Sequence, residues 1–183
     1  FLPDRALARL EGLAARGVAY VEEPLPVELI RRRAELRKDS PLPIIADDSC
    51  FSLADLEREL DFDTFDILNV KPARTGVSAS LAMIKLAASA GKGVMVGSQA
   101  ASGLGTVHAA VLALRPEVDH PCELTFPLKL ERDSLASPLD YSGGWLSVDA
   151  LEAARLAPAT ADDSNAPHAG VNMAVDFRRK PHE

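Results

Sequence analysis

The sequence predicts an α/β fold built around a parallel sheet, and three observations support this prediction. Short apolar segments alternate with stretches whose apolar residues recur at helical spacing, which is the order of strands joined by crossover helices. Each of the first four apolar segments ends in a polar residue, and successive ends are 24 to 27 residues apart, enough for a helix and two loops. The composition, 47% hydrophobic and 26% charged over 183 residues, is that of one globular domain.

The first half of the chain shows this alternation most clearly. Residues 2–16 predict a helix, because Pro3 stands in its first turn, apolar residues follow at helical spacing and Gly17 ends it. The apolar stretch 18–22 predicts a strand that is covered on both faces. The segments that follow predict a charged helix over 27–39, a strand over 42–48, a helix over 52–60 capped by Ser52 and a strand over 66–71.

The second half continues the pattern and then loses it. A helix is expected over 77–91 with Gly91 as its stop, followed by a strand over 93–99, a helix over 105–115 and a last strand over 122–128. From residue 129 the chain is rich in Asp, Ser, Pro and Gly, which is typical of irregular structure, with a possible hairpin around 141–148.

Composition excludes several classes of function. The net charge is −7 and the longest basic run is the three arginines at 31–33, so no nucleic-acid partner is expected. Cys50 and Cys122 are too few for a disulfide framework, and no apolar stretch is long enough for a membrane span or a signal peptide. We therefore expect a cytoplasmic protein that acts on a small molecule.

The polar residues at the strand ends are the candidate site. In a parallel sheet the carboxyl ends of the strands share one edge, so Glu22, Asp47, Lys71 and Ser98 should converge there. Catalytic groups collect at this edge in a (β/α) barrel, and ligands bind there in doubly wound sheets, so the spacing leaves both architectures open.

Two carboxylates and a lysine at one edge permit metal-assisted proton abstraction. Oxygen ligands from Glu22 and Asp47 suit Mg²⁺, and Lys71 could serve as a general base. Two structural interpretations compete with this one. Lys71 could simply form an ion pair with Asp47, and Glu22 with Glu23 could merely favour the start of the next helix.

Four segments, taken in order, resemble strand motifs of the enolase superfamily, in its mandelate racemase and muconate-lactonizing-enzyme branch. YVEEPLP (20–26) resembles the motif hEQPhP, and IIADDSCF (44–51) resembles hhADES. DILNVKPARTG (66–76) resembles NhKhxKTGG, and VMVGSQAASGLGT (94–106) resembles hhGxxxESxhG. The order and spacing of the four segments also match those of the family.

The resemblance implies a TIM-type (β/α)7β barrel, of which residues 1–128 would be the C-terminal part. Residues 129–183 would form a tail that packs on the barrel and on an N-terminal capping domain. The implied reaction depends on Mg²⁺, with Mn²⁺ as a substitute, and begins with abstraction of a proton alpha to a carboxylate through a metal-stabilised enolate. Racemases, epimerases, cycloisomerases and o-succinylbenzoate synthases all fit, as does assembly into a homo-oligomer.

The resemblance also assigns roles to residues. Glu22 and Asp47 match metal ligands, and Lys71 matches the catalytic lysine. Arg74 falls where the motif has a second, non-catalytic lysine. The polar residues near the last strand ends, which we take as candidate substrate contacts, are Ser98, Gln99 and Glu123.

The sequence departs from the family pattern at Ala101, where the motif has Glu. The third metal ligand and the opposing base of the family would precede Phe1. A catalytically degenerate, non-enzymatic relative is therefore the alternative function. For an active enzyme we expect Ser98 or Gln99 to take over the hydrogen bonds of the missing Glu. We also expect the Lys71 amine to approach the cation site without contacting Asp47 directly.

Overall fold

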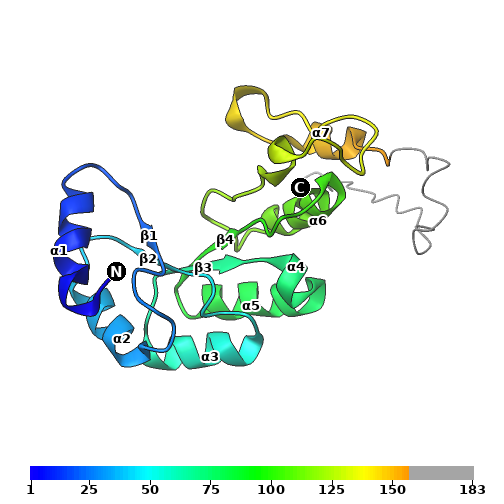
Figure 1. Ribbon diagram of the computed structural model, residues 1–183. Helices are drawn as coiled ribbons and strands as arrows, with labels where there is room; N and C mark the ends of the chain where they lie inside the picture. The colour runs from blue at the N-terminus through cyan, green and yellow to red at the C-terminus, as the bar shows by residue number, and fades with distance from the viewer. Residues whose placement is uncertain (157–183) are drawn as a thin grey trace, which may run out of the picture.

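A computed structural model describes residues 1–156 and has a four-stranded parallel sheet at its centre (Figure 1). Its strands follow one another in chain order, which a doubly wound sheet does not do, so the sheet has the arrangement of a barrel wall. The predicted α/β class is confirmed, and the strand order decides between the two architectures. The strands are β1 (Val21–Glu22), β2 (Ile44–Ala46), β3 (Ile67–Val70) and β4 (Gly93–Val96).

The five predicted helices are all present, with ends that differ from the predicted ones by up to three residues. Ser52 caps α3 (Leu53–Phe62) as expected, accepting a hydrogen bond from the Asp55 N–H. A short helix that was not predicted, α4 (Pro72–Thr75), follows β3 directly. The longer helices are α1 (Pro3–Ala14), α2 (Ile30–Asp39), α3 (Leu53–Phe62), α5 (Val77–Ser89) and α6 (Gly103–Ala113). None of the helices in residues 1–156 is both long and apolar enough for a membrane span.

The two faces of the sheet carry different sets of apolar side chains. One face packs against the helices, and its residues belong to the largest core cluster, which includes Leu68, Val70 and Val94. The other face carries Ile45, Ile67 and Met95, which form a separate buried cluster. Ile45 pairs with Ile67 across the strands, and Met95 pairs with Asn69. Strand alternation therefore places residues 45, 67 and 95, and the residues two further along, on the inner face of the barrel wall.

The strand predicted over 122–128 does not form. The chain does run beside β4, where the N–H groups of His120 and Glu123 donate to the carbonyls of Val94 and Val96 at 3.1 and 3.0 Å. Pro121 cannot donate to a ladder, and residues 126–129 instead form a 3₁₀ turn that contains Pro127. The prediction was wrong because the two prolines have no N–H group to donate to a strand ladder.

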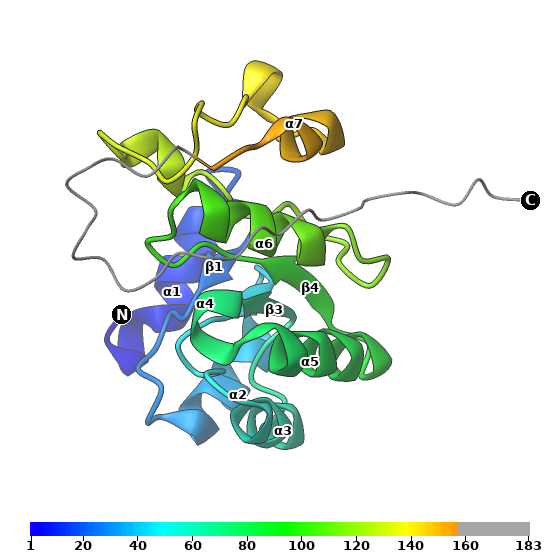
Figure 2. The same ribbon diagram turned by 90° about the vertical axis from the view of Figure 1, so that its right-hand side faces the viewer.

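The hairpin proposed around 141–148 is also wrong. Residues Ser142–Gly144 form a 3₁₀ turn, and Val148–Ala153 form the helix α7, which lies above α6 in Figure 2. Ser147 accepts a hydrogen bond from the Ala150 N–H, so a helix cap stands where the second strand of the hairpin was expected. Residues 157–183 of the predicted tail lie outside the described residues.

Charged residues tie the helices together at the amino-terminal end of the strands. Lys92 donates a hydrogen bond to Asp63 at 2.6 Å, and Arg37 contacts both Asp63 and Asp66. The hydrogen bond from Lys92, with the charges of Lys92 and Arg37, holds the pKa of Asp63 below its usual value although partial burial opposes this. The ionised form of Asp63 is thus favoured in the folded state.

Asp63→Asn is expected to lower stability at neutral pH by about 1 kcal/mol or less, because the pair is half-exposed. Because the pKa of Asp63 is lower in the folded state, its contribution is complete above the unfolded pKa and disappears as the pH falls through the folded pKa. Urea unfolding of the full-length protein at pH 7 and pH 3 checks this. A stability difference from the wild type that grows on acidification would contradict the prediction.

Candidate active site

Glu22, Asp47 and Lys71 come together at the carboxyl ends of β1, β2 and β3. Glu22 pairs with Ile45 across the sheet, and Asp47 and Lys71 share the inner face with Ile45 and Ile67, so all three belong to the barrel interior. Lys71 donates a hydrogen bond directly to Asp47 Oδ2. The predicted convergence of these three residues is therefore present in the structure.

The direct contact between Lys71 and Asp47 differs from our expectation. The Asp47 side chain is only 4% exposed and that of Lys71 14%, so the carboxylate needs a positive partner within reach. Burial would raise the pKa of Asp47, but hydrogen bonds from Lys71 and Glu22 and the charges of Lys71 and Arg74 outweigh it and lower the pKa. The ion pair compensates a buried charge, as the competing structural interpretation of Lys71 predicted.

Arg74 holds the second oxygen of Asp47, a role that the sequence did not suggest. Its guanidinium donates to Asp47 Oδ1, to the Asp47 carbonyl at 3.3 Å and to Asp48 Oδ1 at 2.9 Å. The same group lies 4.2 Å from the centre of the Phe51 ring. Asp47 is thus oriented by Arg74 through one oxygen, while its other oxygen faces Lys71.

Within residues 1–156, Glu22 forms no salt bridge with a positive side chain, in contrast to Asp47. Its carboxyl group is partly buried, and desolvation, the hydrogen bond and charge of Asp47, and the charge of Glu123 together raise its pKa to about 7 against the opposing charge of Lys71. The residue as a whole is exposed, so solvent reaches the site from this side. A site where two acids meet in this way favours a ligand that brings positive charge.

The two adjacent acids at 22 and 23 do different things. Glu22 faces Asp47, whereas Glu23 has a left-handed backbone with φ of 40° and accepts hydrogen bonds from the turn after β2. Helix α2 begins only at Ile30, so the interpretation that these acids start the next helix is wrong. The sequence showed the pair of acids but gave no sign of the separate role of Glu23.

The candidate substrate contacts are less closely gathered. Ser98 follows β4, and its buried hydroxyl has no hydrogen-bond partner within residues 1–156. Gln99 is exposed, and neither side chain takes over hydrogen bonds at the position of Ala101 among the described residues. Glu123 is exposed but lies close enough to Glu22 to raise its pKa. The substrate roles of Ser98, Gln99 and Glu123 stay predictions.

A buried amide lies beside these residues on the inner face. Asn69 is fully buried, and neither atom of its amide has a partner within the described chain. It occupies the space above Gly97, where a Cβ would come within 2.2 Å of Asn69 Oδ1. Glycine at 97 is therefore required by the close approach of this side chain.

Gly97→Ala is expected to destabilise the full-length protein by about 1–3 kcal/mol, because a buried amide must move. Gly12→Ala in α1 is the matched control: its nearest neighbour is the flexible Arg16 guanidinium at 3.3 Å, and the exchange should gain up to about 1 kcal/mol. Urea unfolding of both variants measures the difference. Equal stability of the two variants would show that Asn69 yields without cost.

The oxygen donors at this edge fit a hard divalent cation. Two carboxylates at neighbouring strand ends, with no His or Cys side chain of residues 1–156 bonded to them, match the ligand preference of Mg²⁺. Residues 1–156 hold no group of three or more His, Cys, Asp or Glu side chains that could bind a metal.

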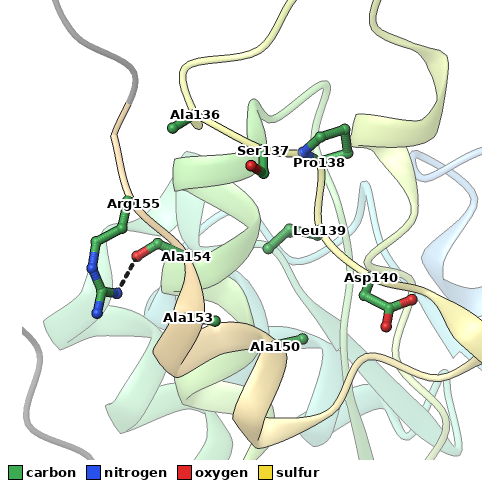
Figure 3. Close-up of a pocket in the computed structure, with 9 residues that line it drawn as sticks. All are labelled: Ala136, Ser137, Pro138, Leu139, Asp140, Ala150, Ala153, Ala154 and Arg155. Carbon is green, nitrogen blue, oxygen red and sulfur yellow. Dashed lines mark hydrogen bonds between the residues drawn. The ribbon is translucent and has the colours of Figure 1, made fainter.

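A pocket of about 240 Å³ between residues 136–140 and α7 includes none of the strand-end residues (Figure 3).

A family model described as enolase C-terminal domain-like matches residues 1–153, and the chain belongs to this family. The D-Ala-D/L-Ala epimerase of Cytophaga hutchinsonii is 30% identical over 139 residues, covering 75% of this chain and 38% of the relative. The resemblance to the superfamily predicted from the four motifs is confirmed.

Solved structures agree with this assignment. The dipeptide epimerase from Cytophaga hutchinsonii, in complex with Mg and the dipeptide D-Ala-L-Val, is 28% identical with a TM-score of 0.72, over 79% of this chain and 39% of that one. Muconate cycloisomerase from Pseudomonas fluorescens is 27% identical with a TM-score of 0.78, over 85% and 44%. The chain spans less than half the length of these relatives.

Proposed function

We propose that this chain is the C-terminal part of the barrel of a racemase or epimerase that abstracts a proton alpha to a carboxylate. The observation that carries the proposal is the contact of the Lys71 amine with Asp47, beside Glu22, at the strand ends of a chain from this family. Relatives named as epimerases and racemases support this reaction, and favour dipeptides or N-acylated amino acids as substrates. Cycloisomerisation is the second candidate, since muconate cycloisomerases share the fold.

Glu22 and Asp47 would supply two ligands to Mg²⁺ or Mn²⁺, with a third from the part of the protein that precedes Phe1. When bound by these carboxylates, a divalent cation would stabilise the negative charge that develops on the substrate carboxylate. Arg74 keeps one oxygen of Asp47 engaged and thereby fixes the direction of the other.

Lys71 would take the proton from the substrate α-carbon. Its amine can accept a proton only in the neutral form, because an ammonium has no free electron pair. It must also leave Asp47 before it can reach the substrate. Its side chain extends from the end of β3 on the inner face and is 14% exposed, so it can reach a substrate in the barrel mouth. A base on the opposite face, from the upstream part of the protein, would complete a racemase.

Residues 1–128 would form the barrel part of this unit, and the tail from 129 onward would join it to the upstream domain. Leu135, Leu139 and Leu151 of the tail already pack into the main core. Trp145, in contrast, is 76% exposed, which is unusual for a large aromatic side chain. We propose that this exposed side faces the N-terminal part of the same protein.

Exchange of substrate α-protons with deuterated solvent tests the proposal. The full-length protein is incubated with Mg²⁺ and a panel of N-acylated amino acids and dipeptides, and deuterium incorporation is followed by NMR. Metal-dependent incorporation with inversion supports an epimerase. Lack of exchange over the whole panel, with the metal bound, would favour the catalytically degenerate relative that Ala101 suggests.

A further inference from the structure

We propose that Glu23 is a positioning residue for Asp47 and that Arg33 and Glu59 hold it in place. The proposal rests on the proposed function, because it concerns how a metal ligand is oriented. Glu23 Oε1 accepts hydrogen bonds from the Asp47 N–H at 2.8 Å, the Ser49 N–H at 3.1 Å and the Ser49 hydroxyl at 2.7 Å. One carboxylate oxygen therefore fixes the backbone of the turn from which Asp47 projects.

The other oxygen of Glu23 leads into a buried chain of charges. Glu23 Oε2 lies 3.1 Å from Arg33 Nη2 as an ion pair, and Arg33 Nη1 donates to Glu59 Oε2 at 2.7 Å. The side chains of Arg33 and Glu59 are 3% and 0% exposed, and Thr64 donates a further hydrogen bond to Glu59. These charged side chains thus connect the end of β1 to α2 and α3.

Stability alone is a weak explanation for these buried charges. Desolvating them is costly, and apolar side chains of similar volume often stabilise a protein equally well or better. The backbone of Glu23 adds a further cost, since a left-handed conformation is unfavourable for a residue with a side chain. The buried charges and the left-handed backbone together direct the Glu23 carboxylate at the amide of Asp47.

This geometry separates the duties of the two adjacent acids. In an extended strand, Glu22 and Glu23 would point to opposite faces of the sheet. The left-handed turn at Glu23 instead brings its side chain over the end of β2, next to the residue that Glu22 faces. Partners that orient a metal ligand typically contribute 10–100-fold to metal affinity or activity. Glu23 would act in this way, through the backbone of Asp47.

Three variants of the full-length protein test the inference. Glu23→Ala removes the acceptor, Glu23→Gln keeps an acceptor oxygen but removes the charge, and Glu35→Ala removes an exposed acid that pairs with Arg32 at 3.5 Å on α2. The measurements are the dissociation constant of Mn²⁺ by electron paramagnetic resonance, hydrogen exchange of the Asp47 and Ser49 amides in the metal-free protein, and the melting temperature.

Glu23→Ala is expected to weaken Mn²⁺ binding by roughly 10–100-fold and to speed exchange at both amides. Glu23→Gln should restore most of the affinity and the protection, because the hydrogen bonds remain possible, although its melting temperature falls when Arg33 loses a partner. Glu35→Ala should match the wild type in all three measurements.

A Glu23→Ala protein with wild-type Mn²⁺ affinity and amide protection, but a lower melting temperature, would overturn the inference and leave Glu23 a purely structural residue. A wild-type protein that binds no Mn²⁺ would instead overturn the proposed function. Should Glu23→Ala fail to fold, Ser49→Ala decides, since it removes only the hydroxyl donor. Unchanged Mn²⁺ affinity and unchanged Asp47 amide exchange in Ser49→Ala would then count against the inference.

Discussion

Lys71→Ala in the full-length protein is expected to abolish turnover and α-proton exchange while leaving metal binding and the fold largely intact. General base catalysis typically contributes 10²–10⁴-fold. The rate of α-proton exchange should therefore fall at least about 10²-fold below that of the wild type. Asp47 keeps Arg74 as a positive partner in the variant, which limits the loss of stability. Deuterium incorporation into the substrate, Mn²⁺ titration and thermal unfolding measure the three expectations.

Lys92→Ala is the matched control for this experiment. Lys92 is also a partly buried lysine paired with an aspartate, Asp63, but it lies at the amino-terminal end of the strands. Its loss should lower the melting temperature without changing exchange at saturating substrate. A Lys71→Ala enzyme that exchanges at near wild-type rate would show that another group is the base. A variant that loses the metal or unfolds would support the structural ion pair.

The fold was predictable because its signals are local. Apolar periodicity and helix caps such as Ser52 mark each element, and parallel strands must end at one edge, so Glu22, Asp47 and Lys71 could be placed together before any coordinates were known. Apolar content alone wrongly predicted a strand over 122–128, because it does not register that Pro121 and Pro127 lack the N–H donors a ladder needs.

The contacts within the site depend on features that spacing does not encode. The left-handed turn at Glu23 sends its side chain to a neighbouring strand end, and no local pattern distinguishes it from Glu22. The hydrogen bond from Arg74 to Asp47 joins residues 27 positions apart in the sequence, and the one from Lys71 to Asp47 joins residues 24 positions apart. Such contacts are decided by how buried charge is compensated after the sheet has formed.

Glu22→Gln is expected to weaken metal binding without lowering the stability of the metal-free protein. An amide oxygen brings no charge to the cation, so Mn²⁺ affinity should fall by more than roughly a hundredfold, since losing a partner that only orients a ligand already costs 10–100-fold. The melting temperature of the metal-free protein at pH 8 should stay equal or rise. The reason is that the neutral side chain removes the repulsion from Asp47 and Glu123 that contributes to the raised pKa of Glu22.

Asp47→Asn provides the contrast that makes the Glu22 experiment decisive. It also removes a ligand, but it leaves Lys71 and Arg74 without their shared carboxylate, so the metal-free protein should lose stability, by up to about 3–5 kcal/mol for a broken buried pair. Both variants should therefore lose Mn²⁺, while only Asp47→Asn melts at a lower temperature. A Glu22→Gln protein that binds Mn²⁺ as tightly as the wild type would remove Glu22 from the metal site. A ligand carboxylate beside other acids destabilises the metal-free protein, so its replacement should not lower the melting temperature. A Glu22→Gln protein that melts well below the wild type would therefore show that the Glu22 carboxylate is a structural group.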